Sequence, residues 1–150
     1  MLLSKASEQG IRVMLYVAKE SAGAPVLVRD VAVALDIPSS SVAKIVQNLT
    51  RQGLLKSHKG PGGGVTLGDS GEQATLLRVV EVSEGLDLTR GCVLGIPGCS
   101  DEGDHCPLHE RWGAIREQLV SMLADATIAG LAGELDEQNY VLSRDDGGGK

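Results

Sequence analysis

All three cysteines of this 150-residue chain lie in one short segment, and their spacing is regular. They occur at every seventh position, as Cys92, Cys99 and Cys106, and His109 follows three residues after the last of them. Thiolates and imidazoles are ligands for zinc, copper and iron–sulfur centres. An odd number of cysteines argues against a secreted disulfide framework. The segment is therefore a candidate for metal or redox chemistry in a reducing compartment.

Three kinds of centre fit these four side chains to different degrees. Structural zinc sites favour gaps of two to four residues between ligands, and both gaps here are six residues long. A thiol–disulfide switch needs two cysteines and leaves the third unexplained. An iron–sulfur cluster is larger than a single ion, so a widely spaced loop with glycines at positions 91, 95, 98 and 103 suits it. We favour the cluster, with zinc and a thiol switch as the alternatives.

A long helix is expected over residues 107–130. Cys106 precedes Pro107, a preferred first residue of a helix, so the positive end of this helix would point at a cluster. Apolar residues then recur at steps of four and three, a heptad seam that predicts helix pairing between two subunits. The alternative is a seam buried within one subunit. The seam consists of Leu108, Trp112, Ile115, Leu119, Met122 and Ala126.

The two halves of the chain have opposite charge. Residues 1–66 contain eight Lys/Arg and four Asp/Glu, whereas residues 67–150 contain six and sixteen, so the net charge of −6 hides a basic half. A polyanionic partner therefore belongs with the first half. No apolar run approaches the ~20 residues of a membrane span, and early charges leave no room for a signal-peptide core. We expect a cytoplasmic protein without membrane contact.

The pattern of the basic half, residues 1–66, predicts a winged helix-turn-helix. Helices are expected over residues 4–21, 29–36 and 39–52, followed by two extended segments, "LLKSHK" and "VTLGD", joined by "GPGGG". This order of helices, turn and glycine-tipped hairpin is that of a winged DNA reader. A fourth helix is expected over 72–84. The fold class is therefore mainly α with a small β-hairpin wing.

The helix over 39–52 is the expected recognition helix. Its apolar residues share one face, and the opposite face is short, polar or cationic, as suits a DNA major groove. A cationic wing tip suits the minor groove. The alternative is a solvated face without a partner. The candidate DNA contacts are Ser39, Ser40, Ser41, Lys44, Gln47, Asn48 and Arg51 in the helix and His58, Lys59 and Gly62 in the wing.

These elements divide the chain into five segments. No nucleotide-binding loop or catalytic triad is evident, so the sequence does not predict an enzyme. The expected segments are a winged helix-turn-helix domain (1–68), a connecting helix (69–90), a cluster-binding loop (91–106), a dimerisation helix (107–130) and a C-terminal segment with a disordered tail (131–150).

The combination resembles the IscR/NsrR-type (Rrf-type) bacterial transcription regulators over about residues 1–130. "KGPGGGVTL" in the wing and the cysteine triplet followed by "PLHERW" carry the resemblance. It implies a homodimer that binds a palindromic double-stranded DNA operator. It also implies one iron–sulfur cluster per subunit, which controls operator binding in response to iron–sulfur status, redox state or nitric oxide.

The resemblance also assigns ligands. Cys92, Cys99 and Cys106 would be the thiolate ligands, and His109 matches the histidine that completes a 2Fe–2S site in the IscR branch. Glu8 falls where the NsrR branch supplies a carboxylate from the partner subunit to a 4Fe–4S cluster. Both cysteine gaps are longer than is usual in the family.

The alternative functions are a winged-helix regulator with a zinc or thiol sensor, and an iron–sulfur electron carrier.

Overall fold

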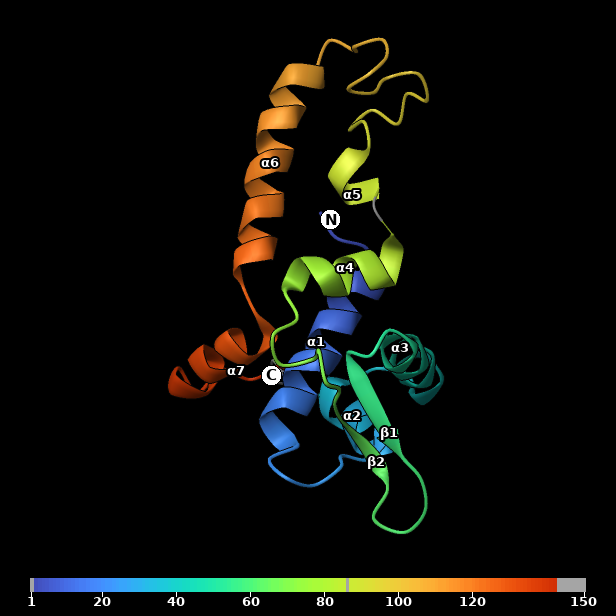
Figure 1. Ribbon diagram of the computed structural model, residues 1–150, viewed down its shortest axis with the longest axis vertical. Helices are drawn as coiled ribbons and strands as arrows, with labels where there is room; N and C mark the ends of the chain where they lie inside the picture. Colours follow the sequence, from blue (N-terminus) through green and yellow to red (C-terminus); the bar gives the residue numbers. More distant parts are fainter. Residues whose placement is uncertain (1, 86, 143–150) are drawn as a thin grey trace, which may run out of the picture.

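The chain folds into a winged-helix body from which a helical arm extends (Figure 1). The computed structural model describes residues 2–85 and 87–142. The body consists of α1 (Lys5–Glu20), α2 (Val28–Leu35), α3 (Ser39–Arg51), β1 (Leu55–His58) and β2 (Gly64–Leu67). The elements that follow are α4 (Leu76–Glu84), α5 (Asp87–Arg90), α6 (His109–Asp125) and α7 (Ile128–Glu137). The expected fold class, mainly helical with a small β wing, is confirmed.

α1 is the central helix of the body. Its N-terminus is capped by Ser4, whose hydroxyl accepts from the Ser7 backbone N–H at 3.1 Å. Val13, Met14 and Val17 are fully buried, and the helix packs against α2, α3, α4 and α7. The broad apolar face of α1 is therefore covered on several sides within its own chain.

The wing is an antiparallel hairpin in which Leu55 pairs with Leu67 and His58 pairs with Gly64. Val26, which precedes α2, extends this sheet, because the N–H of Val65 donates to its carbonyl at 2.8 Å. Gly64 has φ +139°, and a Cβ at this position would collide with the Val26 carbonyl. The close approach of these two segments therefore requires glycine.

The expected helix over 107–130 is wrong in extent. α6 ends at Asp125, Ala126 is extended, and α7 begins at Ile128. The Ala126 carbonyl accepts from the Leu76 N–H at 2.9 Å, which ties this junction to the start of α4. Thr127 then caps α7 by accepting from the Gly130 N–H at 3.1 Å. Ala126 therefore lies outside the helical seam in which it was placed.

The other segments also differ from the expected division. The helix expected over 72–84 begins at Leu76 with Thr75 as its cap, and the segment 69–90 contains two helices rather than one. α7 occupies the start of 131–150, whereas residues 143–150, which include the expected disordered tail, lie outside the described residues.

α6 stands beside α5 in the arm, and the cysteine loop joins them at its end (Figure 1). The base of the arm is held to the body by a small apolar cluster of Val80 on α4 with Leu119 and Leu123 on α6. The cysteine loop and the wing consequently lie at opposite ends of the long axis (Figure 1). A signal that passes within one chain from the loop to the wing must pass through these helices.

Candidate metal centre and nucleic-acid interface

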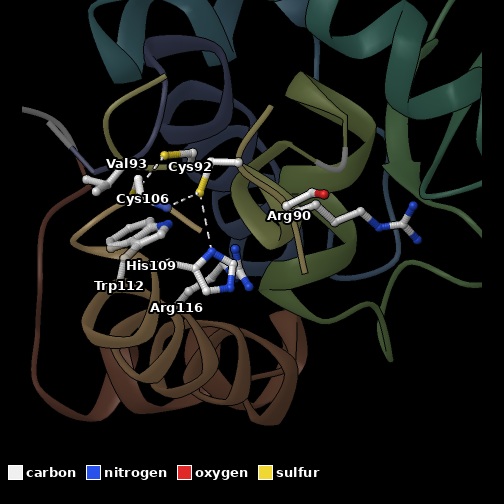
Figure 2. A pocket seen from close by; sticks show the side chains of 9 residues that line it. Arg90, Cys92, Val93, Cys106, His109, Trp112 and Arg116 are labelled. Atoms are coloured by element: carbon white, nitrogen blue, oxygen red, sulfur yellow. Dashed lines mark hydrogen bonds between the residues drawn. The ribbon is translucent and has the colours of Figure 1, made fainter. Parts of the chain in front are cut away.

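Side chains of α6 hold the cysteine loop in place. The Gly91 carbonyl accepts from the Trp112 indole N–H at 2.8 Å and from the Arg116 guanidinium at 3.4 Å. Arg116 also donates to the Asp101 carboxylate at 3.2 Å. The beginning and the middle of the loop are thereby fixed to one helix. Figure 2 shows Trp112 and Arg116 beside the sulfurs, with Arg90 extending away from them.

The structure brings together the four side chains that the spacing singled out. The Sγ atoms of Cys92 and Cys106 are 3.6 Å apart (Figure 2). The Sγ of Cys99 is 3.3 Å from Nδ1 of His109. All three sulfurs lie within 4.8 Å of one another. The loop brings Cys92 back to the start of α6, where the other donors lie.

His109 is oriented from three sides. Its Nδ1 faces Cys99, and its Nε2 lies 3.4 Å from the Asp101 carboxylate. Its ring stacks on that of His105, with centroids 3.8 Å apart. The tautomer protonated at Nε2 places its N–H beside the Asp101 carboxylate and leaves the lone pair of Nδ1 facing the Cys99 sulfur. Asp101 was not among the predicted ligands, and its pairing with α6 is a long-range contact that no local pattern encodes.

Two of the thiols, those of Cys92 and Cys99, have pKa values shifted in opposite directions. Backbone hydrogen bonds, the strongest from Ile96, and the neighbouring Cys106 and Cys99 side chains lower the pKa of Cys92 to about 7. The Cys106 N–H favours the thiolate of Cys99, but burial and the adjacent thiols outweigh it and raise the pKa of Cys99. Cys92 is thus the more readily ionised of these two thiols.

Glu8 is not part of this group within one subunit. It lies in the first turn of α1, and the cysteine group of the described residues consists of the three cysteines alone. A contribution from Glu8 requires a partner subunit, as the family resemblance implied.

The polar face of α3 presents most of the predicted DNA contacts to solvent. Ser41 is half-buried, and the exposed residues are Ser39, Ser40, Lys44, Gln47 and Arg51. Asn48 lies differently, because its amide donates to the Val82 carbonyl of α4 at 2.8 Å. The structure therefore places Asn48 at the junction between α3 and α4.

The wing presents a cation at its tip. Lys59 is exposed, and Gly62 has φ +73° with open space around it. His58 is held against the hairpin by a 2.9 Å hydrogen bond between its Nε2 and Thr66. Arg29, which is outside the predicted set of DNA contacts, has a side chain that is 80% exposed beside a groove that Ser57 and His58 also line. Its signal was a basic residue at the start of a helix-turn-helix.

One basic residue of the first half is used inside the fold. Arg12 donates to the Leu35 carbonyl at 2.7 Å and to the Leu142 carbonyl at 3.1 Å. It therefore contributes to holding the C-terminal segment on the body.

The predicted heptad seam is divided between two faces of α6. Leu119 is buried within the chain and Trp112 faces the loop, as the single-subunit alternative predicted. Leu108, Ile115 and Met122, seven residues apart, remain exposed, the last two at 55% and 59%. We call these three residues the outer stripe. An exposed apolar stripe of this kind is typical of an interface.

Comparison with known proteins identifies the family. The model of Rrf2, described as an iron-dependent transcriptional regulator, matches residues 3–134. The chain belongs to the Rrf2 family. The HTH-type transcriptional regulator IscR of Serratia proteamaculans (strain 568) is 33% identical over 137 residues, which cover 91% of this chain and 82% of that protein. IscR of Cronobacter sakazakii is 33% identical over 147 residues, which cover 97% of this chain and 86% of that protein.

Solved structures show the Rrf2 fold. CymR (YrzC), the global cysteine regulator of B. subtilis, superposes with a TM-score of 0.72 at 23% identity, covering 88% of this chain and 96% of that one. T. potens IscR superposes with a TM-score of 0.73 at 18% identity, covering 91% of this chain and 89% of that one. The expected relationship to Rrf-type regulators is confirmed, and the chain is a winged-helix transcriptional regulator rather than an enzyme. In the part of the Rrf2 chain described above, no helix combines the length and apolar character needed to cross a membrane.

Proposed function

We propose that the chain is a homodimeric, cytoplasmic regulator whose binding to a palindromic operator is controlled by an iron–sulfur cluster, one in each subunit. The observation that carries this proposal is the grouping of Cys92, Cys99 and Cys106 beside the start of α6, where His109 contacts the Cys99 sulfur. This grouping occurs in a member of a family of iron-dependent regulators.

The donor set fits an iron–sulfur cluster. Such clusters are held by cysteine thiolates, and histidine replaces cysteine in some of them. The Cys106 N–H donates to the Cys99 sulfur at 3.4 Å, and hydrogen bonds of this kind tune iron–sulfur centres. Cys92, with its pKa lowered to about 7, supplies a thiolate at neutral pH. When bound, the cluster supplies a group that changes charge on oxidation and that reacts with oxidants or nitric oxide.

The protein couples this site to α6 through its own residues. Trp112 and Arg116 attach the Gly91 carbonyl to α6, and Arg116 also holds Asp101 against His109. A change in the positions of the sulfurs therefore changes the contacts along one face of α6. That face continues to Leu119, which packs against α4 in the body.

The exposed cations indicate which surfaces of the chain would contact DNA. Lys44, Gln47 and Arg51 are exposed on one face of α3 for the major groove, and Lys59 stands at the wing tip for the minor groove. Arg29 at the start of α2 adds a phosphate contact. The outer stripe of α6 pairs the two subunits, and its burial sets the distance between the two recognition helices.

Anaerobic purification with iron, sulfide and zinc analysis tests the proposal. We expect equal amounts of iron and sulfide with visible charge-transfer absorption, and the iron content of each subunit then assigns a 2Fe–2S or a 4Fe–4S cluster. The same sample must bind operator DNA with an affinity that differs from that of the cluster-free form. A protein that takes up no iron and sulfide on reconstitution contradicts the proposal.

A further inference from the structure

We propose that the cluster-free subunit binds one zinc ion through Cys92, Cys99, Cys106 and His109, and that this ion competes with cluster assembly. Zinc binding by the four donors stands independently of the proposed function. The competition rests on the proposed function.

Two of the donor pairs have the separations expected for the edges of a tetrahedron around a single ion. With Zn–S bonds of about 2.3 Å and a Zn–N bond of about 2.0 Å, neighbouring sulfurs lie roughly 3.8 Å apart and sulfur and nitrogen roughly 3.5 Å. The Cys92–Cys106 sulfurs are 3.6 Å apart, and the Cys99 sulfur is 3.3 Å from Nδ1 of His109. Three cysteines and one histidine form a standard set of structural zinc ligands.

The side chains around these donors complete such a site. Ligating histidines usually donate their second ring N–H to a carboxylate, which fixes the tautomer. Nε2 of His109 has Asp101 at 3.4 Å for this purpose. Arg116, only 11% exposed, pairs with the same carboxylate at 3.2 Å. Asp101 is thereby kept as an acceptor beside His109, and the guanidinium places a positive charge near the thiolates.

A second set of potential ligands adjoins the site but is less suited to an ion. His105 and Glu110 lie close to His109, yet their side chains are 48% and 88% exposed. Nδ1 of His109 already faces Cys99. His105 is therefore a stacking neighbour of His109 rather than a ligand, which makes it a matched control.

Zinc and the cluster require the same donors, so they exclude each other. Zinc binding replaces the thiol protons, which pass to solvent, and it leaves no free thiolate for iron. A subunit loaded with zinc holds the loop closed on a single ion. The ratio of available zinc to iron would then set the fraction of subunits that acquire a cluster.

The test is an anaerobic titration of the reduced, cluster-free full chain with Zn²⁺ against a chromogenic chelator. Co²⁺ serves as a spectroscopic probe of the same site. We expect one ion per subunit and the absorption of tetrahedral cobalt–thiolate coordination. Cys99→Ser and His109→Ala abolish this spectrum, and Asp101→Asn lowers zinc affinity about 10–100-fold. His105→Ala, which removes only a stacking neighbour of His109, should lower zinc affinity less than Asp101→Asn does.

Because Cys99 is buried, its variant is checked by circular dichroism, and exposed Asp101 provides the independent variant. Substoichiometric zinc, or an equal loss of affinity in the Asp101 and His105 variants, overturns the proposal. Cluster reconstitution of metal-free and zinc-loaded protein separates the two hypotheses. Uptake of zinc without any cluster refutes the proposed function alone, whereas a cluster without stoichiometric zinc refutes this inference alone. Cluster assembly at an undiminished rate on zinc-loaded protein refutes the competition.

Discussion

The side-chain amide of Asn48 on α3 donates a hydrogen bond to the backbone carbonyl of Val82 on α4 over 2.8 Å. Val82 lies in the last turn of α4, where backbone carbonyls have no partner within the helix. Gln52, just after α3, accepts from Arg78 of the same helix at 3.1 Å. α3 is thus attached at two points to α4, which Val80 joins to α6.

We expect Asn48→Ala to reduce the difference in operator affinity between the cluster-loaded and cluster-free forms. Loss of one such hydrogen bond costs about 1 kcal/mol, so the chain should remain folded while α3 moves more freely relative to α4. Gel-shift titration of both forms measures the ratio of their dissociation constants. Gln47→Ala is the control, because its exposed side chain leaves α4 untouched and should weaken both forms alike. An unchanged ratio in Asn48→Ala removes this contact from the coupling.

Lys44→Ala should weaken operator binding without lowering thermal stability, because the side chain is exposed on the reading face. If Lys44 contacts one phosphate, its removal should reduce the slope of log affinity against log salt by about 0.9. Fluorescence anisotropy at several salt concentrations measures this slope. Lys5→Ala, an exposed change on α1 away from α3, is the matched control. Equal slopes for wild type and Lys44→Ala would place this residue away from the DNA backbone.

If the outer stripe pairs two subunits as proposed, Ile115→Glu should yield monomers, because Ile115 is 55% exposed at the centre of this stripe. A carboxylate buried there without a partner opposes association. Light scattering measures the mass, and circular dichroism checks the fold. Leu123→Ala is the contrasting variant: Leu123 is buried against Val80, so its truncation should cost about 2–5 kcal/mol of stability. A dimeric Ile115→Glu protein places the interface elsewhere.

The parts of the molecule that sequence reasoning predicted are those with local signals. α1 has a serine cap and a helical stripe, the wing has glycines at its turn, and the regular cysteine spacing pointed to a group of thiols that the structure brings within 4.8 Å of one another. The end of α6 was missed because the extended conformation of Ala126 depends on its contact with the start of α4.

The sequence pattern also did not predict the contacts between elements that are distant in the chain. A heptad repeat identifies the apolar positions of α6 but does not say which of them are covered by the same chain. Leu119 and Ile115 were both assigned to the dimerisation seam, yet Leu119 is buried within the chain and Ile115 is exposed. Asn48 shares the polar face of α3 in the sequence, and only the position of α4 reveals that its amide is used internally.

Alkylation of the reduced, metal-free protein should modify Cys92 first. Its pKa is lowered to about 7, whereas an ordinary thiol titrates near 8.5. Because the thiolate is the nucleophile, the rate at Cys92 should rise with pH, reach half of its maximum at about pH 7 and level off at higher pH. Cys99, whose pKa is raised, should react only at higher pH. Iodoacetamide labelling followed by peptide mass spectrometry measures both, with urea-unfolded protein as the reference. Faster labelling of Cys99 than Cys92 at pH 7 contradicts the described environments.

Gly64→Ala should destabilise the wing more than Gly62→Ala, although both glycines belong to the same hairpin. At Gly62 only the positive φ of +73° opposes a side chain, since the surrounding space is open, and this strain costs about 1–2 kcal/mol. At Gly64 the φ is also positive, at +139°, and the Cβ of an alanine would in addition collide with the Val26 carbonyl. The β-bridge between Val26 and Val65 must therefore open or shift. Hydrogen exchange of the Val65 amide, with thermal melts of both variants, distinguishes the two costs. Equal losses of stability and unchanged protection of Val65 in both variants would mean that the contact between Val26 and the wing is not maintained in solution.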